Sequence, residues 1–154
     1  MMIHRSNLTC AGLLALVLLA AVGCARPAPV AAVSGLVMLD GKPAPEMVVD
    51  FVPDTEKGTH GPPSSGSTDE QGKFDLVCDD GRDGAVIGFH RVVVKDIRSV
   101  PGPPNRAQGR NKGQGLLPSR ISSAYTVATS TPLREEVKAE PQTITLKLPK
   151  LTKK

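Results

Sequence analysis

The sequence is poor in aromatic residues and in cysteine, and neither sign of charge dominates it. Its 154 residues include no tryptophan, one tyrosine, three phenylalanines and three cysteines. The core of a folded domain must therefore be built mainly from aliphatic side chains. No cysteine or histidine pair has the spacing of a zinc site. The formal net charge of +4 is small and scattered, with no interleaved aromatic residues, so it does not indicate nucleic-acid binding.

Long hydrophobic runs are also missing. The apolar stretch Ala11 to Val22 has 12 residues, whereas a helix that spans a bilayer needs about 20. It follows His4 and Arg5 and is followed by Gly23 and Cys24. A short basic start, an apolar stretch and then small residues are typical of a secretory signal peptide. Residues 1–23 are therefore predicted to be a signal peptide.

The residues around Cys24 carry a second signal. The string Ala21-Val22-Gly23-Cys24 resembles the lipobox of bacterial lipoproteins, which implies a diacylglyceryl group on the Cys24 sulfur and a further acyl chain such as palmitate. Two or three acyl chains, at about 0.8 kcal/mol per buried CH₂, would hold the protein on a membrane. We expect a lipid-anchored protein of the cell envelope that faces the periplasm or the exterior. The alternative is an ordinary secretory signal with a chance cysteine.

Residues 24–32 are predicted to be the lipidated cysteine and a stiff Pro/Ala tether, because proline-rich segments are extended. If Cys10 leaves with the signal peptide and Cys24 is lipidated, Cys78 has no intrachain partner, which excludes a disulfide framework.

Residues 33–148 show short β-runs separated by turn residues, without sustained helical periodicity. About seven strands in this length predict an all-β fold, a small antiparallel β-sandwich. A helical turn is expected within 116–131, a flexible loop within 99–115, and a basic tail over 149–154. The expected strands are Val33–Leu39, Met47–Val52, Ser64–Thr68, Lys73–Cys78, Gly88–Lys95, Leu133–Val137 and Gln142–Leu148.

Alternation along the strands predicts which side chains face inward, because successive residues of a strand point to opposite faces. Charged residues next to the apolar ones indicate which face of each strand is turned to solvent. In the strand Gly88–Lys95 this places Phe89 and Val93 on the outer face. The predicted inward residues are Phe74, Leu76, His90, Val92, Val94, Ile144, Leu146 and Leu148.

Several short motifs occur in a characteristic order. They are Val33-Ser34-Gly35, Leu39 to Pro43, Val49 to Pro53, Thr68 to Phe74, Gly88-x-His90-x-Val92-x-Val94, Tyr125 and Ser130 to Leu133. Together they resemble the small lipoproteins of planctomycete-type bacteria that carry a carboxypeptidase-regulatory-like or transthyretin-like domain. The chain departs from that family at His90, where tyrosine is common. The resemblance implies a prealbumin-like sandwich with Greek-key connections and says little about molecular function.

No set of residues has the spacing of a catalytic site. His60 lies in a Gly/Pro loop, and His90 lies in a strand where a place in the core is favoured over catalysis. No GxSxG motif is present. Cys78 alternates with apolar residues, which favours burial as a small hydrophobe over a redox role. We therefore expect no enzyme and no cofactor.

Two loops contain groups that could bind an ion. Asp79, Asp80 and Asp83 offer oxygen ligands to calcium, but they lack the EF-hand spacing, so a solvated turn is favoured and no metal is predicted. The segment Gly102 to Gly115 holds three basic residues that could meet an anion, but it is no Walker motif, so a flexible loop is favoured. Those basic residues are Arg106, Arg110 and Lys112.

These sequence features are compatible with three functions. The favoured one is a non-catalytic structural or protein-interaction module, anchored to the membrane through Cys24, with an unknown envelope protein or glycan as partner and no nucleic acid. The alternative is a glycan- or peptide-binding module, for which only Phe89 and Tyr125 offer aromatic platforms. A hydrolase would rest on fold analogy alone.

Overall fold

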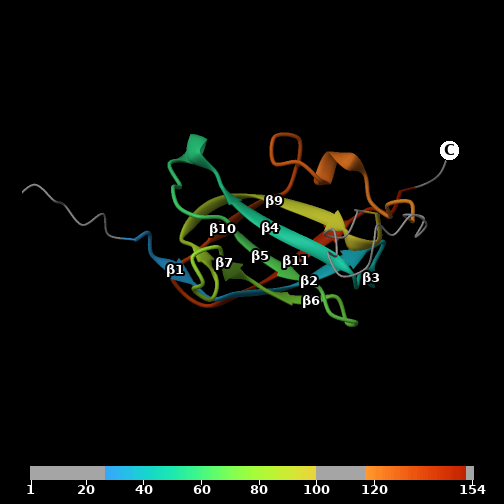
Figure 1. Ribbon diagram of the computed structural model, residues 1–154, viewed down its shortest axis with the longest axis horizontal. Helices are drawn as coiled ribbons and strands as arrows, with labels where there is room; N and C mark the ends of the chain where they lie inside the picture. Colours follow the sequence, from blue (N-terminus) through green and yellow to red (C-terminus); the bar gives the residue numbers. More distant parts are fainter. Residues whose placement is uncertain (1–26, 100–116, 152–154) are drawn as a thin grey trace, which may run out of the picture.

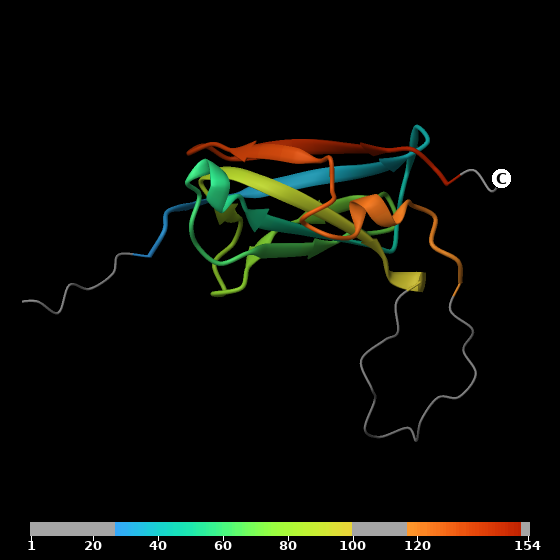
Figure 2. The same cartoon turned by 90° about the horizontal axis from the view of Figure 1, so that it is seen from above.

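The computed structural model describes residues 27–99 and 117–151, and this part of the chain is a small β-sandwich (Figures 1 and 2). The predicted signal peptide, Cys24 and the segment from Gly102 to Gly115 lie outside the described residues. No α-helix occurs in the described ranges. The short 3-10 helices are η2 (Thr55–Lys57), η3 (Ile97–Ser99) and η4 (Ser123–Tyr125).

The described residues form eleven strands. In chain order they are β1 (Val30–Ala31), β2 (Val33–Leu39), β3 (Lys42–Pro43), β4 (Met47–Pro53), β5 (Ser64–Ser67), β6 (Lys73–Asp75), β7 (Val77–Cys78), β8 (Ala85–Val86), β9 (Gly88–Asp96), β10 (Arg134–Val137) and β11 (Gln142–Leu148). One sheet has the order β10-β9-β4-β5-β7, and the other is built on β2, with β11 on one edge and β3 and β6 on the other. Strands β1 and β8 form a separate two-stranded ribbon.

All strand pairs are antiparallel except β11 with β2, which is parallel. The exception follows from the path of the chain. Strand β10 runs along one sheet, and the turn at 138–141 then takes the chain to the edge of the other sheet. On that edge β11 runs in the same direction as β2, so the first long strand pairs with the last.

Each of the seven expected strands is present, and η4 lies in the segment expected to hold a helical turn. The expected strand Lys73–Cys78 is divided at Leu76, because here the chain passes from the sheet of β2 to the sheet of β5. The Leu76 N–H donates to the Val33 carbonyl at 3.0 Å, and its carbonyl accepts from the Gly84 N–H at 2.7 Å. The backbone of Leu76 is therefore satisfied at the corner between the sheets.

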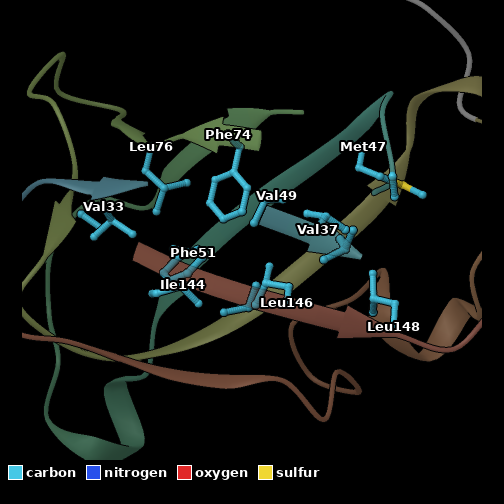
Figure 3. Packing of buried hydrophobic residues seen from close by; sticks show 14 of the residues in the cluster. Val33, Val37, Met47, Val49, Phe51, Phe74, Leu76, Ile144, Leu146 and Leu148 are labelled. Carbon is cyan, nitrogen blue, oxygen red and sulfur yellow. The ribbon is translucent and has the colours of Figure 1, made fainter. Parts of the chain in front are cut away.

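The core lies between the two sheets, as Figure 3 shows. All eight residues predicted to face inward are buried. The ring of Phe74 lies over Gly35 in the neighbouring strand, where an added Cβ would come within 2.3 Å of the ring. Because position 35 is a glycine, the Phe74 ring has room inside the sandwich.

Val93 is on the predicted outer face of β9 but is buried there. Phe89 is 37% exposed, as expected, but Val93 is only 3% exposed although it belongs to the outer face. It lies between Arg91 and Lys95 on that face. Arg91 forms ion pairs with Asp54 at 3.1 Å and with a neighbouring glutamate, and Lys95 with Asp50 at 2.7 Å. Long cationic side chains cover apolar surface with their stems when their ends are held, which accounts for the burial of Val93.

A matched pair of substitutions in β11 tests the inward register. Leu146 is 1% exposed, and its neighbour Thr145 points to solvent. Leu146→Ala should lower the free energy of unfolding by about 2–5 kcal/mol, because it removes buried methyl groups and leaves a cavity. Thr145→Ala should change it by less than about 1 kcal/mol. Denaturant melts measure both values, and equal or reversed costs would show that β11 is out of register.

Candidate functional site

Residues 28–32, a few positions after Cys24, are docked against the sandwich. Strand β1 pairs with β8, with Val30 opposite Val86 and Ala31 opposite Ala85. The Ile87 N–H donates to the Pro29 carbonyl at 2.9 Å. The Gln142 N–H, at the start of β11, donates to the Ala32 carbonyl at 3.1 Å. The expected tether over 24–32 is therefore wrong for its last part, because these residues have backbone partners in the domain.

Arg82 binds one further residue of this segment, Ala28. Its Nη1 donates to the Ala28 carbonyl at 2.7 Å. Asp80 holds the guanidinium in place, with contacts of 3.0 Å from Nε and 2.6 Å from Nη2 to Oδ2. The hydrogen bond from Arg82 lowers the pKa of Asp80 to about 2, so the pair is fully charged at neutral pH. Asp80 thus orients Arg82, which donates the hydrogen bond to the Ala28 carbonyl.

Two glycines make room for the docked chain. Gly84 has φ +103, and a Cβ there would come within 1.9 Å of the Ala31 carbonyl oxygen. A Cβ on Gly61, at φ +147, would meet the Val86 side chain at 2.9 Å and Ala28 at 3.3 Å. Both the conformation and the space require glycine at these positions. The contact between the segment and the domain is therefore close along its length.

The acidic cluster predicted as a solvated turn lies beside this contact. Asp79 and Asp83 are exposed, and Asp80 is occupied by Arg82. In the described ranges 27–99 and 117–151, no three His, Cys, Asp or Glu side chains are grouped so that they could hold a metal ion.

An open groove of about 570 Å³ runs next to the docked segment. Ser34 and Thr143 share a hydrogen bond of 3.1 Å at its wall, and Asp75 and Asp83 add carboxylates. Its apolar lining includes Val33, Leu76, Val77 and Pro141. The groove has the size for a short peptide or a sugar, but no aromatic residue lines it.

The two aromatic residues considered as platforms for a glycan lie elsewhere. Phe89 is on the outer face of β9, and the Lys57 ammonium sits 4.5 Å from the centre of its ring. Tyr125 is partly buried and packs against the core. The structure therefore joins neither of them to the groove.

His90 is a core residue. It is fully buried, its ring centre lies 5.7 Å from that of Phe51, and its Nδ1 is 3.1 Å from the Gly88 carbonyl. Burial lowers the pKa of His90, which keeps the ring neutral. Its Nε2 has no hydrogen-bond partner among the described residues. Cys78 is buried, as expected, and no other cysteine is among the described residues; its Sγ lies 3.8 Å from the Pro62 carbonyl.

A buried ion pair closes the opposite end of the sandwich. The side chain of Asp96 accepts from Arg120 at 2.7 Å and 2.9 Å, and from the Arg120 backbone N–H at 3.0 Å. Burial alone would raise the pKa of Asp96, but the hydrogen bonds from Arg120 outweigh it and hold that pKa well below its usual range. Arg120 also donates to the Pro45 carbonyl at 2.8 Å. This pair ties Arg120 to the end of β9.

The ion pairs of Arg82 and Arg120 were not found from the sequence. Asp80 and Arg82 are close in the chain, but nothing local marks Ala28 as the third partner. Asp96 and Arg120 are separated by 24 residues. Only the fold brings these groups together.

No helix in the described ranges is long and apolar enough to cross a membrane. No protein-family model, curated protein or solved structure matches this chain. The resemblance to transthyretin-like lipoproteins therefore stays a prediction.

The burial of His90 predicts a loss of stability in mild acid. Because its pKa is lowered in the folded state, the unfolded chain binds a proton first as the pH falls below about 6.5, the usual histidine value. The contribution of the neutral ring is therefore complete above that pH. Below that pH this contribution is lost, and the free energy of unfolding falls by at most about 1.4 kcal/mol per pH unit.

Urea melts between pH 7.5 and pH 5 measure this effect, with His90→Phe as the comparison. Glu135, opposite His90 in β10, has a pKa raised by burial and acts in the opposite direction, but it is common to both proteins. The variant should lose less stability than the parent as the pH falls. The same pH dependence in both would rule out a neutral, buried His90.

Proposed function

We propose that this protein is a membrane-anchored lipoprotein of the cell envelope, lipidated at Cys24, whose sandwich is a non-catalytic structural or protein-interaction module. The apolar stretch, the small residues and the cysteine occur in the order that a lipoprotein signal requires. The β-sandwich supports the second half of the proposal, because folds of this type commonly serve as modules on cell surfaces.

The observation that carries the proposal is the position of the first docked residue. Ala28 is held by Arg82, so three residues separate it from Cys24. A folded domain thus begins almost directly after the lipobox. This arrangement suits a module that is held at a membrane surface.

The environment of the reactive side chains also supports a non-catalytic role. His90 is enclosed in the core, and Cys78 is buried. The neutral ring of His90 packs against Phe51 and lies beyond the reach of a substrate in solvent. Catalysis by a histidine base requires hydrogen-bond access to the reacting group, which His90 does not have.

The groove beside Ser34 and Thr143 favours one alternative, a module that binds a peptide or a glycan. Its hydroxyls and carboxylates are groups that recognise such ligands, although it has no aromatic platform. A screen of glycans and peptides against the chain from residue 25 separates this alternative from a purely structural role.

Replacement of the lipidated residue tests the proposal. Cys24→Ser should release the protein from the membrane fraction or leave it with its signal peptide, because the acyl chains that hold it can no longer be attached. Cys78→Ser is the matched control and should leave fractionation unchanged, because that thiol is buried in the domain. Membrane fractionation and the mass of the N-terminal peptide report both results. A Cys24→Ser protein that stays in the membrane with a normally processed N-terminus would contradict the proposal.

A further inference from the structure

We infer that one end of the sandwich, formed by the β1–β8 ribbon and the turns at 79–84 and 138–141, is held next to the lipid bilayer that carries the anchor. The opposite end is directed away from that bilayer. We call the first the anchor end. The inference rests on the proposed lipidation of Cys24.

The first step is the length of the intervening chain. Ala28 is fixed to the domain by Arg82 at 2.7 Å. An extended chain covers at most about 3.6 Å per residue, so the Cα atoms of Cys24 and Ala28 lie within about 14 Å of each other. The domain is therefore joined to the lipidated residue at its anchor end, by a chain of at most about 14 Å.

The second step is that the domain holds the segment over several successive residues. The carbonyls of Ala28, Pro29 and Ala32 each accept a hydrogen bond from a different part of the domain. Between them lies the ladder of β1 with β8, and Ala31 is 7% exposed. Release of the segment would break these bonds together, so it moves with the domain as one unit.

The third step is the direction of the strands. Strand β2 starts at the anchor end and runs for 7 residues, about 23 Å, toward the other end. Figures 1 and 2 both place β1 at one end of the long axis, with β3 and η3 toward the other. The turn at 69–72 also lies at that far end, because the Gly72 carbonyl accepts from the Val37 N–H at 2.8 Å.

Electrostatic attraction to lipid headgroups does not account for the proximity of the anchor end to the bilayer. The two turns of the anchor end carry four acidic residues, Asp79, Asp80, Asp83 and Glu140, against two basic ones, Arg82 and Lys138. Anionic headgroups attract clusters of lysine and arginine, and that attraction is screened by salt. The short chain alone thus holds this end, so its distance from the bilayer is independent of salt and depends on the length of the chain.

Fluorescence quenching on vesicles tests the inference. The full lipidated chain, with Cys78→Ser, is reconstituted in phosphatidylcholine vesicles that contain a lipid with a nitroxide headgroup. A fluorophore is attached at Glu140→Cys, in the anchor end, or at Glu70→Cys, in the far turn. Both positions are exposed glutamates, so the change in charge is the same. We expect quenching to be several-fold stronger at position 140, at low and at high salt.

A longer tether provides the second variant. An insertion of about 12 Gly/Ser residues between Arg26 and Pro27 adds a root-mean-square length of about 20 Å. It should reduce the quenching at position 140 toward the value at position 70, without change in the fold as seen by circular dichroism. Unchanged quenching after the insertion would contradict the claim that the short chain holds the anchor end.

The mass of the N-terminal peptide separates the two possible failures. Equal quenching at both positions, or stronger quenching at position 70, in a protein whose Cys24 carries lipid would overturn the orientation and leave the proposed function standing. A Cys24 without lipid would overturn the proposed function and the orientation with it.

Discussion

Strand β2 has hydrogen-bonded partners on both edges, with β11 on one and β3 and β6 on the other. The rest of the fold depends on this central position. One residue separates β2 from β1, so the docked N-terminal residues lead directly into the middle of a sheet. Because the last strand pairs with β2, the two ends of the domain sequence stabilise each other. The docking of residues 28–32 is therefore a continuation of the core and moves with it.

The interior combines aliphatic side chains with glycines where backbones or rings approach closely. Phe74 fills the space above Gly35, and a Cβ on Gly66 would come within 2.3 Å of the Asp75 carbonyl oxygen. Both contacts involve residues just before the corner at Leu76, where the chain changes sheets. Close approach of this kind increases the dispersion contacts of the interior, which are individually weak and collectively large. Ion pairs then fix the two ends, Asp80 with Arg82 at one and Asp96 with Arg120 at the other.

The long strands could be predicted because alternation of apolar and polar residues is a local signal that the sheet preserves. It identified β2, β4, β9 and β11, and it gave the inward face of β9 and of β11. It could not reveal that β11 is parallel to β2, since alternation is the same for both directions. Strands β1 and β8 have two residues each and were too short to show a pattern. In the candidate site, Cys24 could be predicted from the motif around it. The hydrogen bond from Arg82 to the Ala28 carbonyl could not, because these residues are 54 positions apart in the sequence.

The docked part of the chain begins at Ala28, three residues after Cys24. From Ala28 onward the chain belongs to the domain. Amide hydrogen exchange of the soluble chain from residue 25 tests this at Ile87, whose N–H bonds to Pro29, against Gln142, whose N–H bonds to Ala32. Both amides should be protected by orders of magnitude relative to an unstructured peptide. A protected Gln142 with an Ile87 that exchanges at the unstructured rate would show that the segment before Ala32 is a free tether.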